Sequence, residues 1–464
     1  MDTRCQLRSD AAPSLPMSAL SALARKHRMP GAQLAIHHDG VTATAEVGEL
    51  EVRTARRVTR DAAFPIGSIT KCLTATVAMI LVADGDVDPD APVAEYVPEL
   101  GNLGTLLSLR HLLSHTSGLP DTMGIEEAST ATLERYLADH VARKNLLLPP
   151  GTGFSYSSPG FAVVGRLIET ITGMPWAEAV ESILLRPLGI EPVFVNLPGA
   201  RPSRRPVATG HSVNSQMGRI RPVQQSIMPA DAPAGALALS AADLVTLGLM
   251  HLGPGMARLL PADFASEMRQ PVPGAEPFGL ADSWALGLAV YRHGGAEWVG
   301  HDGNADGTAC YLRINADDGW VIALTSNANT GAGLWRDLLA ELHRAGVPIG
   351  PPHVPERGGA QVTPPPSCIG RFANGGVEYL VTVSGGRSVR MSVDGENYVP
   401  LTFHDNLTFS LLDPDSGQRV FGGRFMCEPD TGRVYGVQVG GRLAARQVFP
   451  RTGLADAEPL APTG

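Results

Sequence analysis

A serine and a lysine three residues apart could together carry out nucleophilic catalysis. They are Ser68 and Lys71 in the sequence SITK, after which apolar residues recur at helical spacing and stop before Asp84. Because three residues span nearly one helical turn, both side chains would lie on one face of the helix. A serine hydroxyl needs a base, and a buried, neutral lysine can accept its proton. The pattern predicts a nucleophile and its base, although a surface serine and lysine could share a helix by chance.

The scarcity of lysine favours the catalytic interpretation. Of the 37 lysines and arginines in the chain, only Lys26, Lys71 and Lys144 are lysine. Arginine stays protonated in proteins and cannot act as a base. A lysine kept among so many arginines therefore invites a chemical explanation, even if the other two lysines are incidental.

Two further short segments carry side chains that suit the same chemistry. Tyr156 could share the proton as a base or as an acid to the leaving group, and Ser158 could hydrogen-bond Lys71 or a substrate amide. His301 could orient the substrate or relay a proton, and Gly303 would let a substrate backbone approach a strand edge. A buried, hydrogen-bonded tyrosine and a structural histidine before a glycine-rich turn are the alternative interpretations.

Two backbone N–H groups are candidates for an oxyanion hole. The N–H of Ser68 would be unpaired at the start of its helix, where it can stabilise negative charge. The N–H of Asn304 follows the His301–Gly303 segment, which we expect to open a run that becomes a strand near Ala309. Together the two N–H groups could bind the oxygen of a tetrahedral intermediate.

The composition narrows the class of protein. A chain of 464 residues with 44% hydrophobic and 18% charged residues indicates a globular protein of two domains. A formal net charge of -9 argues against nucleic acid or an anionic membrane as the main partner. The five cysteines are widely separated and form no C-x-x-C pair, which argues against a disulfide framework and a zinc site. We expect no metal and no cofactor.

The same reasoning predicts the location of the protein. The N-terminal residues lack the uninterrupted apolar core of a signal peptide. No stretch approaches the roughly 18 apolar residues that a spanning helix needs. We expect a cytoplasmic protein without a membrane segment, and the sequence indicates no particular oligomeric state.

We expect a catalytic domain over residues 1–350 with an α/β (α+β) fold. Strand-like segments lie near both of its ends and helices lie between them, which is typical of a mainly antiparallel sheet. The expected strands are residues 32–38, 42–50, 284–292, 309–314 and 320–326. Helices are expected at residues 17–27 and 333–344.

A second, smaller domain is expected after a linker. Residues 351–366 are rich in proline and glycine and have no periodicity, so they predict the linker. Residues 367–452 hold about eight short alternating segments, which predict a small antiparallel barrel or sandwich. Residues 453–464 are expected to be a tail.

The three motifs in this order resemble those of the serine β-lactamase and penicillin-binding-protein superfamily, which has S-x-x-K, Y-x-N and K-T-G or H-x-G. The segments LRHLLSHTSG (109–118) and PAGALALSAAD (233–243) resemble further family segments that we expect to be structural. The resemblance spans about residues 17–345 and implies a Ser68 acyl-enzyme, with Lys71 and Tyr156 handling the proton. Ser158 stands where most members have asparagine, so its role as a substrate ligand stays open. Gly235 is a further expected substrate ligand.

The chain is more specifically similar to the penicillin-binding-protein-type thioesterases, stand-alone enzymes that release and macrocyclise nonribosomal peptides. Residues 30–33, 210–213 with 219–224, 275–282 and 300–310 carry this resemblance, and the small β domain fits their lipocalin-like one. It implies that a peptidyl thioester on a peptidyl carrier protein acylates Ser68 and leaves as a head-to-tail macrocycle. Histidine at 301 in place of lysine argues against β-lactam resistance.

Two alternatives remain. A cytoplasmic esterase or D-stereospecific peptidase or amidase would use water to resolve the same acyl-enzyme. A binding protein that had lost the chemistry is disfavoured by the intact Ser68, Lys71 and Tyr156. We also expect Arg446, near the last strand, to contact a peptide carboxylate, with a solvated strand edge as the alternative.

Overall fold

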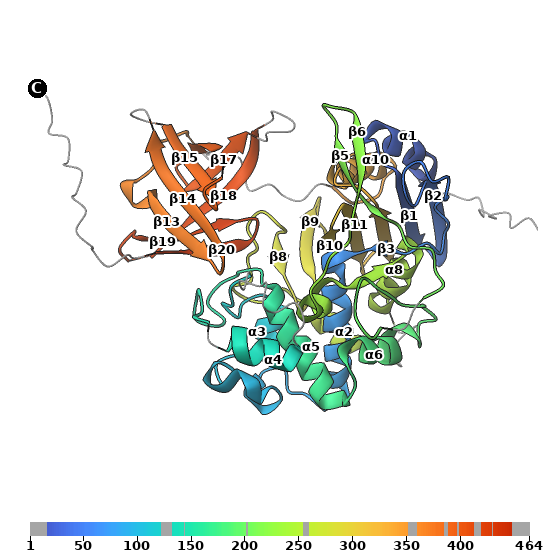
Figure 1. Ribbon diagram of the computed structural model, residues 1–464, viewed down its shortest axis with the longest axis horizontal. Helices are drawn as coiled ribbons and strands as arrows, with labels where there is room; N and C mark the ends of the chain where they lie inside the picture. The colour runs from blue at the N-terminus through green and yellow to red at the C-terminus, as the bar shows by residue number, and fades with distance from the viewer. Residues whose placement is uncertain are drawn as a thin grey trace, which may run out of the picture. The chain divides into compact units, whose positions relative to one another are not determined.

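The computed structural model (Figure 1) divides the chain into two compact units, which are described separately below. One unit is Met1–Arg357 with Gly440–Arg442, and the other is Gly358–Val439 with Leu443–Gly464. The structure describes residues 16–121, 132–142, 144–200, 203–253, 259–350, 360–384, 388–396, 399–412, 419–428 and 430–447. The predicted tail and residues 351–359 of the predicted linker lie outside these ranges.

A seven-stranded antiparallel sheet forms the centre of the first unit, with the order β2-β1-β12-β11-β10-β9-β8. Two strands from the start of the chain therefore pair with five strands from its end, which confirms the predicted mainly antiparallel α/β architecture. The strands are β1 (Gly31–His38), β2 (Val41–Gly48), β8 (Ser283–Trp284), β9 (Ala289–His293), β10 (Ala296–Ala305), β11 (Thr308–Asn315) and β12 (Trp320–Ser326).

Both faces of this sheet are covered, because its central strands alternate buried side chains between two hydrophobic clusters. In β1, Leu34 and Ile36 belong to one cluster and Ala35 to the other. The cluster of Leu34 is completed by α1 (Ala19–Lys26) and α10 (Gly331–Arg344), which contact each other. The cluster of Ala35 contains α2 (Thr70–Ala83), α5 (Ser158–Thr172) and α8 (Ala241–Gly248). Helix α2 is buried on nearly every side, as a helix that is apolar all round must be.

Shorter elements complete the first unit. The remaining helices are α3 (Leu109–Leu113), α4 (Leu133–Tyr136), α6 (Trp176–Ala179), α7 (Ala232–Gly235) and α9 (Ala262–Glu267). A three-stranded sheet contains β3 (Phe64–Pro65), β7 (Leu237–Leu239) and β4 (Val193–Phe194), and a hairpin contains β5 (Gly210–Asn214) and β6 (Arg219–Val223).

Two predicted features of the sheet are wrong. Residues 301–303 do not precede a strand but lie inside β10. The glycines, asparagine and aspartate of β10 have a low strand propensity, so the sequence does not indicate a strand there. Pairing with β9 and β11 on either side overrides this weak local propensity. The segment 284–292 is not one strand, because a tight turn at Gly287, where φ is +77°, separates β8 from β9.

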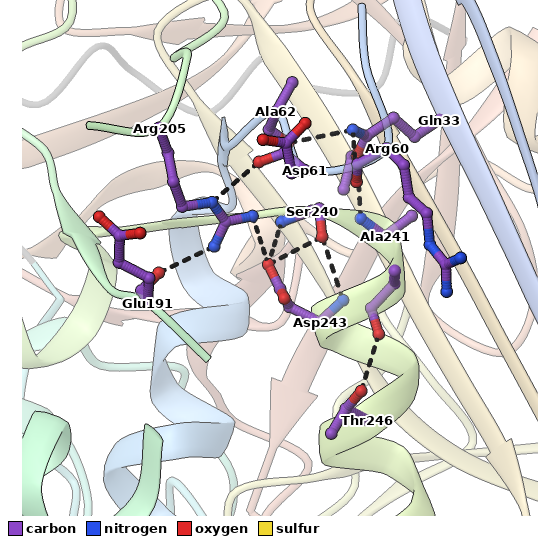
Figure 2. Close-up of polar contacts among 12 residues, drawn as sticks. Gln33, Arg60, Asp61, Ala62, Glu191, Arg205, Ser240, Ala241, Asp243 and Thr246 are labelled. Carbon is purple, nitrogen blue, oxygen red and sulfur yellow. Dashed lines mark hydrogen bonds and ion pairs between the residues drawn. The ribbon is translucent and has the colours of Figure 1, made fainter. Parts of the chain in front are cut away.

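An arginine whose side chain is 8% exposed, Arg205, fastens the loop before β5 to the body of the first unit (Figure 2). Arg205 donates from Nε to the carbonyl of Asp61 (2.8 Å), from Nη1 to the carbonyl of Glu191 (2.8 Å) and from Nη2 to Oδ2 of Asp243 (2.6 Å). Asp243 also forms a capping box with Ser240 at the start of α8. These residues line a hollow of about 490 Å³. Because each nitrogen of the guanidinium already donates to the chain, the role of Arg205 is structural.

The second unit is a closed barrel of eight strands (orange to red in Figure 1), as expected for a lipocalin-like domain. Its core contains Phe372, Phe403, Phe409 and Phe425, whose rings are in contact. Val362, in the predicted linker, donates its N–H to the carbonyl of Phe403, so this part of the linker adds to the barrel. The strands are β13 (Gly370–Asn374), β14 (Val377–Ser384), β15 (Ser388–Val393), β16 (Val399–Phe403), β17 (Thr408–Leu412), β18 (Arg419–Cys427), β19 (Val434–Val439) and β20 (Arg442–Arg446).

Candidate active site

Ser68 and Lys71 lie where the chain enters α2. Ser68 is half-buried in the 3₁₀ turn η2 (Gly67–Ile69), and Lys71 stands one turn later in α2 with only 1% of its surface exposed. Nζ of Lys71 lies 3.1 Å from Oγ of Ser68 and donates a second hydrogen bond to the carbonyl of Ala234, also at 3.1 Å. The predicted pair is therefore within hydrogen-bond distance, and α7 also binds the lysine through the carbonyl of Ala234.

Two glycines bring η2 against β10. Gly67 has φ of +50°, and a Cβ at this position would lie 2.2 Å from the carbonyl oxygen of Asn304. A Cβ on Gly303 would lie 1.9 Å from the carbonyl oxygen of Ile66. Any side chain at either position would push the turn and the strand apart. This close approach places the backbone of Ser68 beside that of Asn304, as an oxyanion hole requires.

Tyr156 lies against the lysine and is fixed by aromatic neighbours. Its ring centroid is 5.0 Å from Nζ of Lys71, and it stacks on His115 with the ring centroids 4.2 Å apart. Nδ1 of His115 accepts a hydrogen bond from the N–H of Ser157 (3.1 Å), so Nε2 carries the imidazole proton. Burial, with a smaller contribution from Lys71, lowers the pKa of His115 well below its usual value. His115 is therefore neutral and supports the tyrosine ring.

His301 is a neutral hydrogen-bond acceptor in the same cluster. Its Nδ1 lies 2.5 Å from the carbonyl oxygen of Asp302, which can only accept, so Nδ1 carries the proton and Nε2 a lone pair. Burial and then Lys71 lower the pKa of His301 to about 3. Among the described residues none pairs with the buried Nε2. The imidazole and the Trp284 ring form an edge-to-face pair with centroids 5.2 Å apart, and the imidazole centroid lies 6.2 Å from the centroid of the Tyr156 ring.

Five of the predicted residues, Ser68, Lys71, Ser158, Gly235 and Asn304, border one pocket of about 320 Å³, and Tyr156, His301 and Gly303 are not among its lining residues. Ser158 begins α5, and its N–H donates to Oδ1 of Asp121 (2.8 Å). Gly235 ends α7, and Asn304 lies in β10. The lining residues are Gly67, Ser68, Lys71, Ser158, Val195, Gln225, Ser226, Ile227, Asp231, Ala234, Gly235, Asn304, Ala305 and Asp306.

Arg446 lies in the last strand of the barrel, β20. Its guanidinium donates from Nε to the carbonyl of Val434 (2.9 Å) and from Nη1 to that of Ile369 (3.1 Å), and Nη2 contacts the carbonyl of Ser367. These bonds give the side chain a structural role in the barrel. Its contact with a substrate carboxylate stays a prediction.

Sequence reasoning missed three side chains of the site. His115 lies in the segment 109–118, whose histidine could have been suspected from its place in the SHTSG sequence. Trp284 packs on His115, Tyr156 and His301, and only its place beside a predicted strand hinted at burial. No sequence signal marked Asp231, which lines the pocket.

Within the described ranges, no three histidine, cysteine or acidic side chains gather closely enough to hold a metal ion. No helix in this part of the chain is both long and apolar enough to cross a membrane.

Comparison with known proteins gives a family match to residues 18–345 and two solved structures that match 93% of the chain. Residues 18–345 match the Beta-lactamase family. The crystal structure of SurE is 39% identical with a TM-score of 0.84, covering 93% of this chain and 98% of SurE. SurE with D-Leu gives 39% identity and a TM-score of 0.82 over 93% of this chain and 99% of that one.

Two further proteins match about 70% of the chain. Penicillin-binding protein 4 of Amycolatopsis lactamdurans is 33% identical over 334 residues, which are 69% of this chain and 87% of that protein. A D-stereospecific amidohydrolase from Streptomyces sp. is 26% identical with a TM-score of 0.57, covering 70% of this chain and 98% of the amidohydrolase.

Proposed function

Since the chain belongs to the Beta-lactamase family, we propose that it is a serine acyltransferase that releases a carrier-bound peptide as a head-to-tail macrocycle. The enzyme class, a serine hydrolase of the β-lactamase and penicillin-binding-protein type, follows from the family itself. The observation that carries the finer proposal is the likeness to SurE over 93% of the chain, which includes the barrel. The motifs that resemble peptide-releasing thioesterases support the same substrate class.

In the acylation step Ser68 attacks the carbonyl carbon of the peptidyl thioester. Nζ of Lys71, 3.1 Å away, takes the proton from Oγ as the C–O bond forms. The backbone N–H groups of Ser68 and Asn304 stabilise the oxyanion. The C–S bond then breaks, and the pantetheine thiolate takes the proton from the Lys71–Tyr156 pair. The products are a peptidyl ester on Ser68 and a free thiol.

In the second step the N-terminal amine of the peptide attacks the ester carbonyl. A C–N bond forms, the bond between carbon and Oγ breaks, and the proton lost by nitrogen returns to Oγ through Lys71 and Tyr156. An amine on the same chain competes well with water at about 55 M, because effective molarities of well-oriented groups reach ~10⁵–10⁸ M. Cyclisation therefore needs a peptide whose N-terminal amine is held beside the ester rather than a stronger nucleophile.

His301 assists these proton transfers. Its buried Nε2 has a free lone pair and lies in the same cluster as Tyr156. A neutral imidazole there can accept a hydrogen bond from the tyrosine hydroxyl or from a substrate N–H. The lowered pKa of His301 keeps the ring neutral over the whole range in which the enzyme would work.

Hydrolysis of the acyl-enzyme is the second candidate. The 26% identity to a D-stereospecific amidohydrolase favours it, because water would resolve an intermediate of the same kind there. Both reactions share the acylation step and differ only in the acceptor.

Synthetic thioesters test the proposal. The enzyme is given N-acetylcysteamine thioesters of peptides of six to ten residues, including peptides that end in a D-amino acid. We expect products lighter by one water than the linear acid, as measured by mass spectrometry. Linear acid as the main product across varied sequences would instead establish the hydrolase.

A further inference from the structure

The catalytic pocket contains a carboxylate that the proposed chemistry does not use. Asp231 ends the turn η8 (Pro229–Asp231), directly before α7, and it lines the pocket with Ser68 and Lys71. The same stretch of chain supplies the carbonyl of Ala234 that accepts from Lys71. Asp231 is therefore held on a segment that is fixed to the catalytic lysine.

No described residue donates a hydrogen bond to the Asp231 carboxylate. Other half-buried aspartates nearby are paired, since Asp121 accepts from the N–H of Ser158 (2.8 Å) and Asp302 pairs with Arg313 (2.6 Å). Burial raises the pKa of Asp231, Lys71 opposes this shift, and Asp121 adds to it. A desolvated carboxylate without a donor is unfavourable until a ligand supplies one.

The charge of the pocket indicates which ligand fits. Among the lining residues, Lys71 is the only side chain that can carry a positive charge, and its Nζ already contacts Ser68 and Ala234. The other acidic residue, Asp306, is exposed and accepts a hydrogen bond from the N–H of Ser226 (2.8 Å). The lining residues therefore offer Asp231 no free cationic partner, and a substrate that carries an ammonium group would bring one.

We propose that Asp231 binds the ammonium group of the acyl acceptor, the N-terminal amine of the peptide, and so directs the Ser68 ester to aminolysis. This inference rests on the proposed function. The ammonium docks on the carboxylate and loses one proton to solvent, and the neutral amine then attacks the ester. The C–N bond forms as the bond to Oγ breaks, and the second proton from nitrogen returns to Oγ. Asp231 is a specificity residue for the acceptor and takes no part in acylation.

Replacement of Asp231 by asparagine separates the two steps. Asp231→Asn keeps the size of the side chain and removes its charge. We expect thiol release from a peptidyl thioester to stay within about twofold, and the ratio of cyclic to linear product to fall about tenfold or more, since a charge-assisted hydrogen bond is lost. Asp86→Asn, which removes an exposed carboxylate just beyond α2, should change neither quantity.

An added acceptor makes the test independent of cyclisation. The same thioester with its N-terminus acetylated is offered glycinamide, which carries an ammonium group, or methanol, which carries none. Asp231→Asn should lower the ratio of amide to acid with glycinamide and leave the ratio of methyl ester to acid unchanged.

Two outcomes would overturn the inference. If thiol release fell in parallel with product formation, Asp231 would instead position Lys71. If the glycinamide ratio were the same in both enzymes, the carboxylate would not bind the acceptor. A wild-type enzyme that makes only linear acid from unblocked peptides would refute cyclisation, while the glycinamide ratio would still decide the role of Asp231.

Discussion

The residue at position 71 must meet three demands. It must be buried, it must reach Oγ of Ser68, and it must exchange a proton. The structure meets the first two demands, with 1% exposure and a distance of 3.1 Å. The third demand excludes arginine, which has the charge but does not give up its proton. The identity of this residue is therefore a chemical requirement and not a matter of charge.

Lys71→Arg should lower the rate of thioester turnover by about 10²–10⁴, the usual loss for a general base. The rate is measured as thiol release, and circular dichroism checks that the fold is retained. Retention of more than about a tenth of the wild-type rate would refute the assignment of Lys71 as the base.

His301→Ala should slow turnover by about 10 to 10³, less than the loss of the nucleophile, because the imidazole relays or orients and forms no bond to carbon. The measurement is again thiol release, with Ser68→Ala as the inactive reference. An unchanged rate would return His301 to a purely structural role in the Trp284 cluster.

The sequence predicted the side chains whose motifs are local, and missed those that depend on contacts between distant segments. Ser68 and Lys71 are one helical turn apart, so their spacing alone indicates contact. His115 and Trp284 meet only because α3 and the β8–β9 pair fold together. Asp231 enters the pocket through a contact of its segment with α2, which no periodicity reveals.

Strand β10 shows how a catalytic element can contradict its own local propensity. Gly303 is needed where the backbone of Ile66 approaches, and the same glycine weakens the strand signal. Helix α2 shows the opposite case, since its apolar residues and its burial agree. Most elements that only pack were predicted with near-correct bounds, apart from the segment 284–292, while β10, which also contacts the nucleophile's turn, was not predicted as a strand.

Substitution of Arg205 tests how the loop before β5 is fastened to the body of the first unit. Arg205→Met removes the partner of Asp243 and the donors to two carbonyl groups, so the free energy of unfolding should fall by about 1–3 kcal/mol. Arg204→Met, at the exposed neighbouring position, is the matched control and should change it by less than about 0.5 kcal/mol. Urea denaturation measures both. Equal stability of the two variants would mean that the bonds in Figure 2 do not hold this loop.

The division into two units was foreseeable because the composition changes sharply between them. A proline-rich stretch separates long helical periodicities from short alternating segments, and the barrel follows from about eight such segments. Closure of the barrel depends on the pairing of its first and last strands, β13 and β20, which no local pattern encodes.

Buried neutral histidines make the first unit sensitive to acid. Burial lowers the pKa of His251 to about 4 and that of His301 to about 3, below the value of 6.5 for an exposed histidine. Below pH 6.5 the unfolded chain therefore binds more protons than the folded one, and the unfolding free energy falls as the pH falls. Each such histidine contributes a slope of about 1.4 kcal/mol per pH unit.

His251→Gln removes one of these histidines without touching the catalytic pocket. Between pH 6 and 4.5 its unfolding free energy should depend less steeply on pH than that of the wild type, by about 1.4 kcal/mol per unit. All five tryptophans lie in the first unit, so their fluorescence during urea denaturation reports this unit alone. Identical slopes would show that His251 is protonated in the folded protein as readily as in the unfolded one.

The mass of the protein during turnover tests most directly whether Ser68 carries the peptide. The enzyme is mixed with excess peptidyl thioester, quenched in acid within seconds, digested and mapped by mass spectrometry. We predict that the fragment containing Ser68 gains the mass of the peptide acyl group, and that Ser68→Ala gains none and releases no thiol. An acyl group on another residue, or undiminished thiol release by Ser68→Ala, would contradict the account.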